Sequence, residues 1–170
     1  MIPLFSLGLG NTGAHWDKLE EAVGGAIGAA MEEEVEDQVE VEAVEGGYVF
    51  RMADPMSFSL GDAEVSAEVA PLLRSIARVA RVSEGAEVLV EGHTCDLPIH
   101  SERFASNWEL SGARAAAVVR FLEAEGLGNS RMILRARGPY QPLVPNEDEP
   151  ARRKNRRVEI RLTLKELTTP

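Results

Sequence analysis

The feature that most constrains the fold is a strand-like segment that leads through a polar loop into a capped helix. Residues 86–91 form a short, largely apolar run, as expected for a strand. Ser106 and Glu109 then form an S-x-x-E capping box, in which the serine covers a free helix amide and the glutamate reaches back. The apolar residues that follow recur every three or four positions, which predicts a helix with one buried face: Leu110, Ala113, Ala117, Val118, Phe121 and Leu122.

Hydrophobic periodicity elsewhere predicts the remaining elements. Residues 39–43 and 48–52 alternate around a Glu-Gly-Gly turn and predict a hairpin. Residues 65–79 have helical spacing, although Pro71 predicts a late or irregular start. Residues 131–137 and 158–164 are strand-like, and four prolines between residues 138 and 150 predict a long ordered loop or a short helix.

With a helix expected at residues 15–35, the predicted order is helix, hairpin, helix, strand, helix, strand, strand. Two strand–helix–strand units and a returning strand favour a two-layer α+β sandwich with a βαβαββ-type core. We expect a mixed sheet with its helices on one face, plus the N-terminal helix.

Polar residues around the capped helix indicate a binding cleft. Free amides at a helix start attract an anionic group, and Arg114 can add a bidentate contact. Thr94, Asp96 and Asn107 can bind an ammonium, a hydroxyl or an amide group. The implied ligand carries both acid and amine or amide groups, as a peptide does. The alternative is that the polar residues only cap the helix and that Arg114 is a solvated surface residue.

Charge excludes one large class of partner. The chain has 18 basic and 28 acidic residues, a net charge of −10, whereas nucleic-acid binding needs a basic face. The basic run at residues 152–157 lies near Glu147, Asp148 and Glu149, which predicts a local ion-pair network instead.

Two other motifs suggest different chemistry. Residues 8–13 spell G-x-G-x-x-G, but the acidic run near Glu33 replaces the second strand that a dinucleotide-binding fold needs. His93, Cys95, Asp96 and His100 could form a Cys–His catalytic pair or offer metal ligands, without the usual CxxC or HxxxH spacing. We expect His93 to be a buried, hydrogen-bonding residue, and we expect no cofactor.

Three motifs resemble a known family. GHT-x-D-x-PI (residues 92–99), SNWELS-x-x-RA-x-x-VV (106–119) and KNRRVEI (154–160) resemble the OmpA-like peptidoglycan-binding domain, most of all its MotB-like form in flagellar stators. The resemblance covers roughly residues 39–164. It implies an N-terminal helix outside the shared core and a loop at residues 138–150 that borders the ligand cleft.

The resemblance also implies roles for individual residues. In the family, an Asp after the His-Thr pair and the Arg of LS-x-x-RA hold the diaminopimelate-type residue of the peptidoglycan stem peptide. The Arg corresponds to Arg114, but Cys95 occupies the Asp position, and a thiol is mostly neutral at pH 7. Asp96 is the candidate substitute. The remaining residues expected to shape or contact the cleft are Thr94, Asn107, Leu110, Ser111, Asn155 and Arg156.

The implied function is non-enzymatic anchoring of a MotB-like stator to the cell wall. The implied partners are peptidoglycan, a second copy of the chain, and MotA-type membrane subunits. The alternative is an OmpA-like module of an outer-membrane lipoprotein or another envelope complex. We expect a leader (1–14), a helix and linker (15–37), a periplasmic binding domain (38–166) and a frayed tail (167–170). The sequence contains no transmembrane segment, whereas the resemblance implies one, so we expect a fragment of an inner-membrane-anchored protein, with a soluble paralogue as the alternative.

Overall fold

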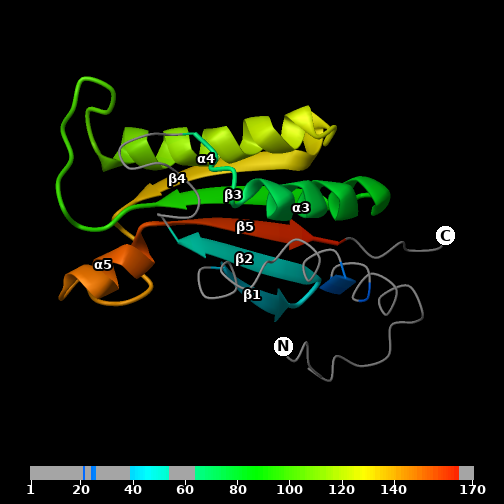
Figure 1. Ribbon diagram of the computed structural model, residues 1–170, viewed down its shortest axis with the longest axis horizontal. Coiled ribbons are helices and arrows are strands. Elements are labelled where there is room, and N and C mark those ends of the chain that lie inside the picture. The colour runs from blue at the N-terminus through cyan, green and yellow to red at the C-terminus, as the bar shows by residue number, and fades with distance from the viewer. Residues whose placement is uncertain (1–20, 22–23, 26–38, 54–63, 165–170) are drawn as a thin grey trace.

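The fold is built on one five-stranded sheet, in the order β1-β2-β5-β3-β4. The computed structural model describes residues 21, 24–25, 39–53 and 64–164 (Figure 1). Neighbouring strands are antiparallel except for β3 and β4, which are parallel. The strands are β1 (Val39–Val44), β2 (Gly47–Ala53), β3 (Glu87–His93), β4 (Met132–Gly138) and β5 (Arg157–Thr163).

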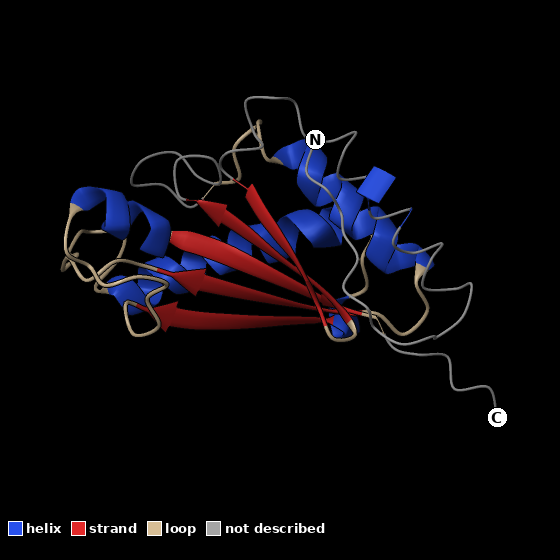
Figure 2. Ribbon diagram, turned by 90° about the horizontal axis from the view of Figure 1, so that it is seen from below, coloured by secondary structure: helices blue, strands red, loops and turns tan. Residues whose placement is uncertain are grey.

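Two long helices lie on the same face of this sheet (Figure 2). They are α3 (Ala70–Val82) and α4 (Asn107–Ala124), and α4 makes the crossover that joins the parallel strands β3 and β4. The short η1 (Asn129–Arg131) precedes β4. Helix α5 (Glu149–Asn155) lies at one end of the sheet, immediately before β5 (Figure 1).

The core lies between this sheet face and the two helices. Alternate residues of each central strand point toward the helices, as the two-residue period of a strand requires. Their partners recur at three- and four-residue spacing on α3 and α4. Central members, all at most 1% exposed, are Phe50, Val88, Val90, Ile160, Leu162, Leu72, Leu73, Ile76, Val118 and Leu122.

Two glycines meet specific requirements of the fold. Gly46 has a φ of 77°, the left-handed conformation needed by the turn between β1 and β2. Gly92, in β3, lies beneath α4, and a Cβ there would lie 2.0 Å from the carbonyl oxygen of Ser111. The glycine of the GHT motif therefore allows α4 to approach β3 closely.

The α+β sandwich, its mixed sheet and its one-sided helices are confirmed. The helix predicted at residues 65–79 begins later, at Ala70, with Pro71 in its first turn. The short helix allowed within residues 138–150 begins at Glu149, near the end of that range, and most of the basic run belongs to it as α5. The G-x-G-x-x-G motif and nearly all of the predicted N-terminal helix lie outside the described residues, so these predictions remain untested.

Candidate functional site

The loop after β3 is joined to the end of β4 and to α4 at one backbone position, Gly138. The amide of Thr94 donates to the carbonyl oxygen of Gly138 at 2.9 Å. The amide of Gly138 in turn donates to the Ser111 hydroxyl at 3.1 Å. Gly138 therefore holds the predicted cleft residues Thr94 and Ser111 in fixed relative positions.

The inward face of α4 carries Arg114 as well as apolar residues. Arg114 is 5% exposed, close to Leu110 at 6% and Ser111 at 0%. The spacing of three and four residues places all three on one side of the helix. The alternative that Arg114 is a solvated surface residue is therefore wrong.

The start of α4 is capped by its own side chains. The Ser106 hydroxyl accepts a hydrogen bond from the Trp108 amide at 3.2 Å and donates to the Glu109 carboxylate. The serine hydrogen bond, with smaller contributions from the amides of Glu109 and Ser106, lowers the pKa of Glu109. The capping box is thus confirmed. Because the Glu109 carboxylate already lies at the start of α4, the free backbone amides there do not form an open site for an anion.

Asn107 also contacts the chain rather than open space. Its side-chain amide donates to the carbonyl oxygen of Leu97 at 3.0 Å, which ties the β3–α4 loop to the first turn of α4.

Basic side chains of the α5 region contact the β3–α4 loop. The Arg152 Nε lies 2.9 Å from Asp96 Oδ1, and this hydrogen bond is the main cause of the raised pKa of Arg152. Arg156 places its Nη1 3.6 Å from the Cys95 sulfur and forms an ion pair with Glu149. The Arg156–Glu149 ion pair belongs to the predicted local network, whereas Arg152 pairs with Asp96 of the β3–α4 loop. Burial lowers the pKa of Arg156, but contacts with Glu149 and Cys95 together raise it.

Asn155 braces the loop between β4 and α5. It is fully buried, and its Oδ1 accepts from the amides of Leu143 and Val144 at 2.8 and 3.1 Å. Its Nδ2 donates to the Val144 carbonyl oxygen and to Asn146 Oδ1, both at 2.8 Å. The expectation that Asn155 reaches a ligand is corrected, because every polar atom of its side chain is engaged within its own loop.

Sequence reasoning missed Arg152, although a local signal was present. Asp148 caps α5 by accepting from the Ala151 amide at 2.8 Å, and Pro150 lies in the first turn. An acidic cap followed by a proline is a typical helix start, and a helix there brings Arg152 to the β3–α4 loop.

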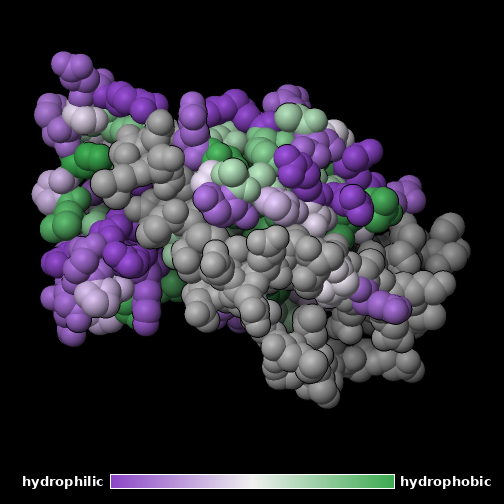
Figure 3. All heavy atoms as spheres, viewed as in Figure 1, coloured by the Kyte–Doolittle hydropathy of each residue, from purple (hydrophilic) through white to green (hydrophobic). Residues whose placement is uncertain are grey.

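An exposed aromatic pair at the same end of the molecule was also missed. Trp108 and Tyr140 are 49% and 67% exposed, and their ring centroids are 5.0 Å apart. Figure 3 shows hydrophobic side chains at this end, beside the mainly hydrophilic surface over α5.

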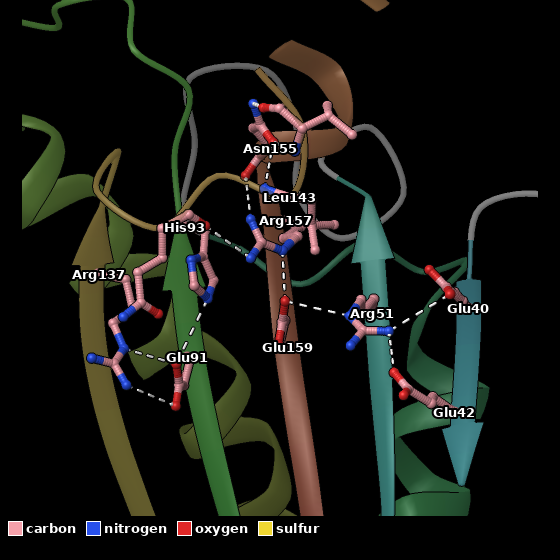
Figure 4. Close-up of polar contacts among 12 residues, drawn as sticks. Glu40, Glu42, Arg51, Glu91, His93, Arg137, Leu143, Asn155, Arg157 and Glu159 are labelled. Carbon is pink, nitrogen blue, oxygen red and sulfur yellow. Dashed lines mark hydrogen bonds and ion pairs between the residues drawn. The ribbon is translucent and has the colours of Figure 1, made fainter. Parts of the chain in front are cut away.

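The sheet face opposite α3 and α4 carries a row of charged residues that crosses the strands (Figure 4). Arg51 of β2 lies 2.7 Å from Glu42 of β1 and 3.5 Å from Glu159 of β5. Arg157 contacts Glu159 at 2.7 Å. On β3, Glu91 accepts a hydrogen bond from Arg137 of β4 at 2.8 Å. Burial raises the pKa of Glu91, but the hydrogen bond and the positive charges around it outweigh burial and lower the pKa.

His93 lies in the same row and is 2% exposed. The buried position is confirmed, but the expected hydrogen bonds are not: neither ring nitrogen has a hydrogen-bond partner within the described chain. Burial, reinforced by the charge of Arg157, lowers the pKa of His93 to about 4. The imidazole is therefore neutral near pH 7.

Comparison with known proteins decides the family. The pattern of the OmpA family matches residues 57–156, more than half of the chain. The chain belongs to the OmpA family. Motility protein B of Bacillus subtilis is 30% identical over 130 residues, which cover 76% of this chain and 50% of that protein. The chain spans about half the length of the relatives that it matches by sequence.

Solved structures with the same OmpA-type fold superpose on this chain. A MotB-like protein from Desulfovibrio vulgaris superposes with a TM-score of 0.77 at 23% identity, covering 89% of this chain and 95% of that one. The cell wall anchor of the type VI secretion system (T6SS) from Pseudomonas aeruginosa has a TM-score of 0.72 at 33% identity. It covers 86% of this chain and 97% of that one.

As a MotB-like member of the OmpA family, the domain is a binding module and not an enzyme. The alternative of a metal site at His93, Cys95, Asp96 and His100 is not supported, because residues 39–53 and 64–164 contain no group of three potential His, Cys, Asp or Glu ligands. His100 is exposed and contacts the Ala105 carbonyl oxygen at 3.3 Å. No helix in the described residues could cross a membrane.

Proposed function

We propose that this OmpA-family domain binds peptidoglycan by the diaminopimelate-type residue of its stem peptide and anchors a MotB-like stator to the cell wall. The family match and the similarity to B. subtilis motility protein B support this function. So does the 33% identity to a protein described as a cell wall anchor.

The observation that carries the proposal is the burial of Arg114 on the α4 face that includes Ser111. An arginine that is 5% exposed interacts with a carboxylate more strongly than a surface arginine does, because water screens the pair less. Its planar guanidinium can donate two parallel hydrogen bonds to one carboxylate. In our proposal, Arg114 binds the stem-peptide carboxylate, and Thr94, Leu110 and Ser111 shape the cleft around it.

Asp96 is the proposed partner of the ligand amine. Its carboxylate is held by Arg152 at 2.9 Å and stays about half exposed, so an incoming ammonium can share or displace that arginine. Cys95 is less suited, because its buried sulfur lies 3.6 Å from the Arg156 guanidinium. A carboxylate introduced by Cys95→Asp would face Arg156, which would compete with the ligand amine.

Calorimetric titration with a diaminopimelate-containing muropeptide tests the site. We expect Arg114→Lys and Asp96→Asn each to weaken binding about ten-fold, or about 1.4 kcal/mol. The lysine keeps the positive charge of Arg114 but cannot donate two parallel hydrogen bonds to one carboxylate. Arg120→Ala, at an exposed position of the same helix, is the matched control. Unchanged affinity in Arg114→Lys and Asp96→Asn would reject this site, and absence of binding by the wild type would reject the function.

The partners and location follow from the same proposal. The domain would lie in the periplasm, dimerise, and connect MotA-type membrane subunits to the wall through the rest of a longer protein. The similarity to the P. aeruginosa anchor also favours a second candidate, an anchor in another envelope complex. An upstream transmembrane helix with a protonatable aspartate would support the stator, and a lipobox would support a lipoprotein.

A further inference from the structure

A polar pocket lies on the sheet face opposite α3 and α4, away from the inward face of α4 that carries Arg114. It has a volume of about 440 Å³, within the range of small-molecule sites. Strands β3, β4 and β5 supply its walls, and Gln141 from the β4–α5 loop also contributes. The residues needed for the argument are His93, Glu91, Arg135, Arg137, Arg157 and Arg161 (Figure 4 labels four of them).

The pocket is basic although the chain is acidic. Its lining includes four arginines and two glutamates, in a protein with a net charge of −10. Glu91 and Glu159 orient Arg137 and Arg157 at 2.8 and 2.7 Å. Two arginines can still donate to a ligand. Arg135 forms a long ion pair with Glu91, at 3.4 Å, and its side chain is 49% exposed. Arg161 has no ion pair within the described part of the chain.

His93 lines the same pocket and needs a hydrogen-bond donor. Its Nε2 lies 3.7 Å from Glu91 Oε2, so the favoured neutral tautomer carries its proton on Nε2, toward the carboxylate. Nδ1 is then a buried acceptor, and no partner for it is present among the described residues. An unsatisfied buried acceptor costs about 1–3 kcal/mol, so a ligand that donates here gains that free energy.

We propose that this pocket binds a phosphate monoester or inorganic phosphate. Arg135 and Arg161 donate to the phosphate oxygens, and the phosphate hydroxyl donates to Nδ1 of His93. A monoester has a second pKa of about 6, so it carries such a hydroxyl in part at neutral pH. A carboxylate or a phosphodiester group is charged but has no proton to donate, and an ammonium group would be repelled by the arginines.

The test is an NMR titration of the full chain with inorganic phosphate at constant ionic strength and pH 6.5, followed at the His93 ring nitrogens. We expect a saturable change in the His93 signals, and an affinity weakened about five-fold or more by Arg161→Gln. Arg120→Gln, which alters an exposed arginine of α4, should bind as the wild type does. Sulfate, which has no proton at this pH, should bind more weakly than phosphate.

Either of two outcomes would overturn the proposal. The first is the absence of a saturable change in the His93 signals. The second is that sulfate and phosphate change these signals equally and that Arg161→Gln does not alter either change. Glucose 6-phosphate and glycerophosphodiesters separate the possible sources, because only the monoester should compete with phosphate. The inference is independent of the proposed wall-binding function: Arg161→Gln should leave muropeptide affinity unchanged.

Discussion

Replacing Asn155 with alanine removes the side chain that braces the β4–α5 loop. Four hydrogen bonds are lost: two accepted from the amides of Leu143 and Val144, and two donated to the Val144 carbonyl oxygen and to Asn146. Each contributes a net of about 0.5–1.5 kcal/mol. Water can reach part of this loop and replace some of them. We therefore expect the free energy of unfolding to fall by about 3 kcal/mol, a large share of the roughly 5–15 kcal/mol typical of a domain.

Urea denaturation measures this change when the wild type and the variant are fitted with the same dependence of unfolding free energy on urea concentration. A thermal scan should show the unfolding midpoint lowered by roughly 10 °C. Asn155→Asp should fall between the wild type and alanine, because the aspartate still accepts from both amides but cannot donate. Asn129→Ala is the matched control; its exposed side chain makes no hydrogen bond that the structure shows, and we expect a change below about 0.5 kcal/mol.

A loss of less than about 1 kcal/mol in Asn155→Ala would refute the bracing argument. Hydrogen exchange at the amides of Leu143 and Val144 gives a second check. Both amides should exchange faster in the alanine variant, whereas amides of β3 should follow only the change in global stability.

Further predictions concern His93, the packing of α4 and its cap. The pKa of His93, about 4 in the folded state, is below its ordinary value near 6.5, so the unfolded chain binds more protons between these values. Stability contributed by neutral His93 is complete above pH 6.5 and is lost as the pH falls toward 4. We expect a loss of roughly 2 kcal/mol between pH 7.5 and 5 in urea denaturation, and a flatter profile in His93→Gln. Gly92→Ala should cost about 3 kcal/mol, because its Cβ would lie 2.0 Å from a backbone oxygen of α4. Gly128→Ala, with open space around its Cβ, should be nearly neutral in the same assay, and equal effects of the two substitutions would contradict the packing argument. Ser106→Ala should cost about 1 kcal/mol and raise the pKa of Glu109 in a carboxyl NMR titration; an unchanged pKa would argue against the cap.

The elements that could be predicted from the sequence depend on local interactions. The hairpin follows from alternation around Gly46, and the start of α4 follows from Ser106 and Glu109, which are three residues apart. Helix α5 had an equally local signal in Asp148 and Pro150, but the short helix predicted as an alternative within residues 138–150 was not extended into the adjacent basic run.

The candidate sites were less predictable, because they depend on which strands become neighbours. The motifs indicated Arg114 and Asp96 but not that Arg152, 56 residues further along the chain, contacts Asp96. The sequence could not show whether the Asn155 side chain binds a ligand or is buried. Its hydrogen-bond partners lie in the loop that precedes α5, and only the folded structure brings them together.

The sequence by itself determined the order of β1, β2, α3, β3, α4, β4 and β5, the apolar part of the buried face of α4, and the membership of the binding-module family. These properties arise from hydrophobic period, capping residues and motif spacing. Only the tertiary structure decided that β5 lies between β2 and β3. That strand order pairs His93 with Arg157 and Glu91 with Glu159 across the sheet. Charged residues that are distant in sequence therefore gather on one face, because hydrogen-bond register and not sequence separation sets which side chains meet.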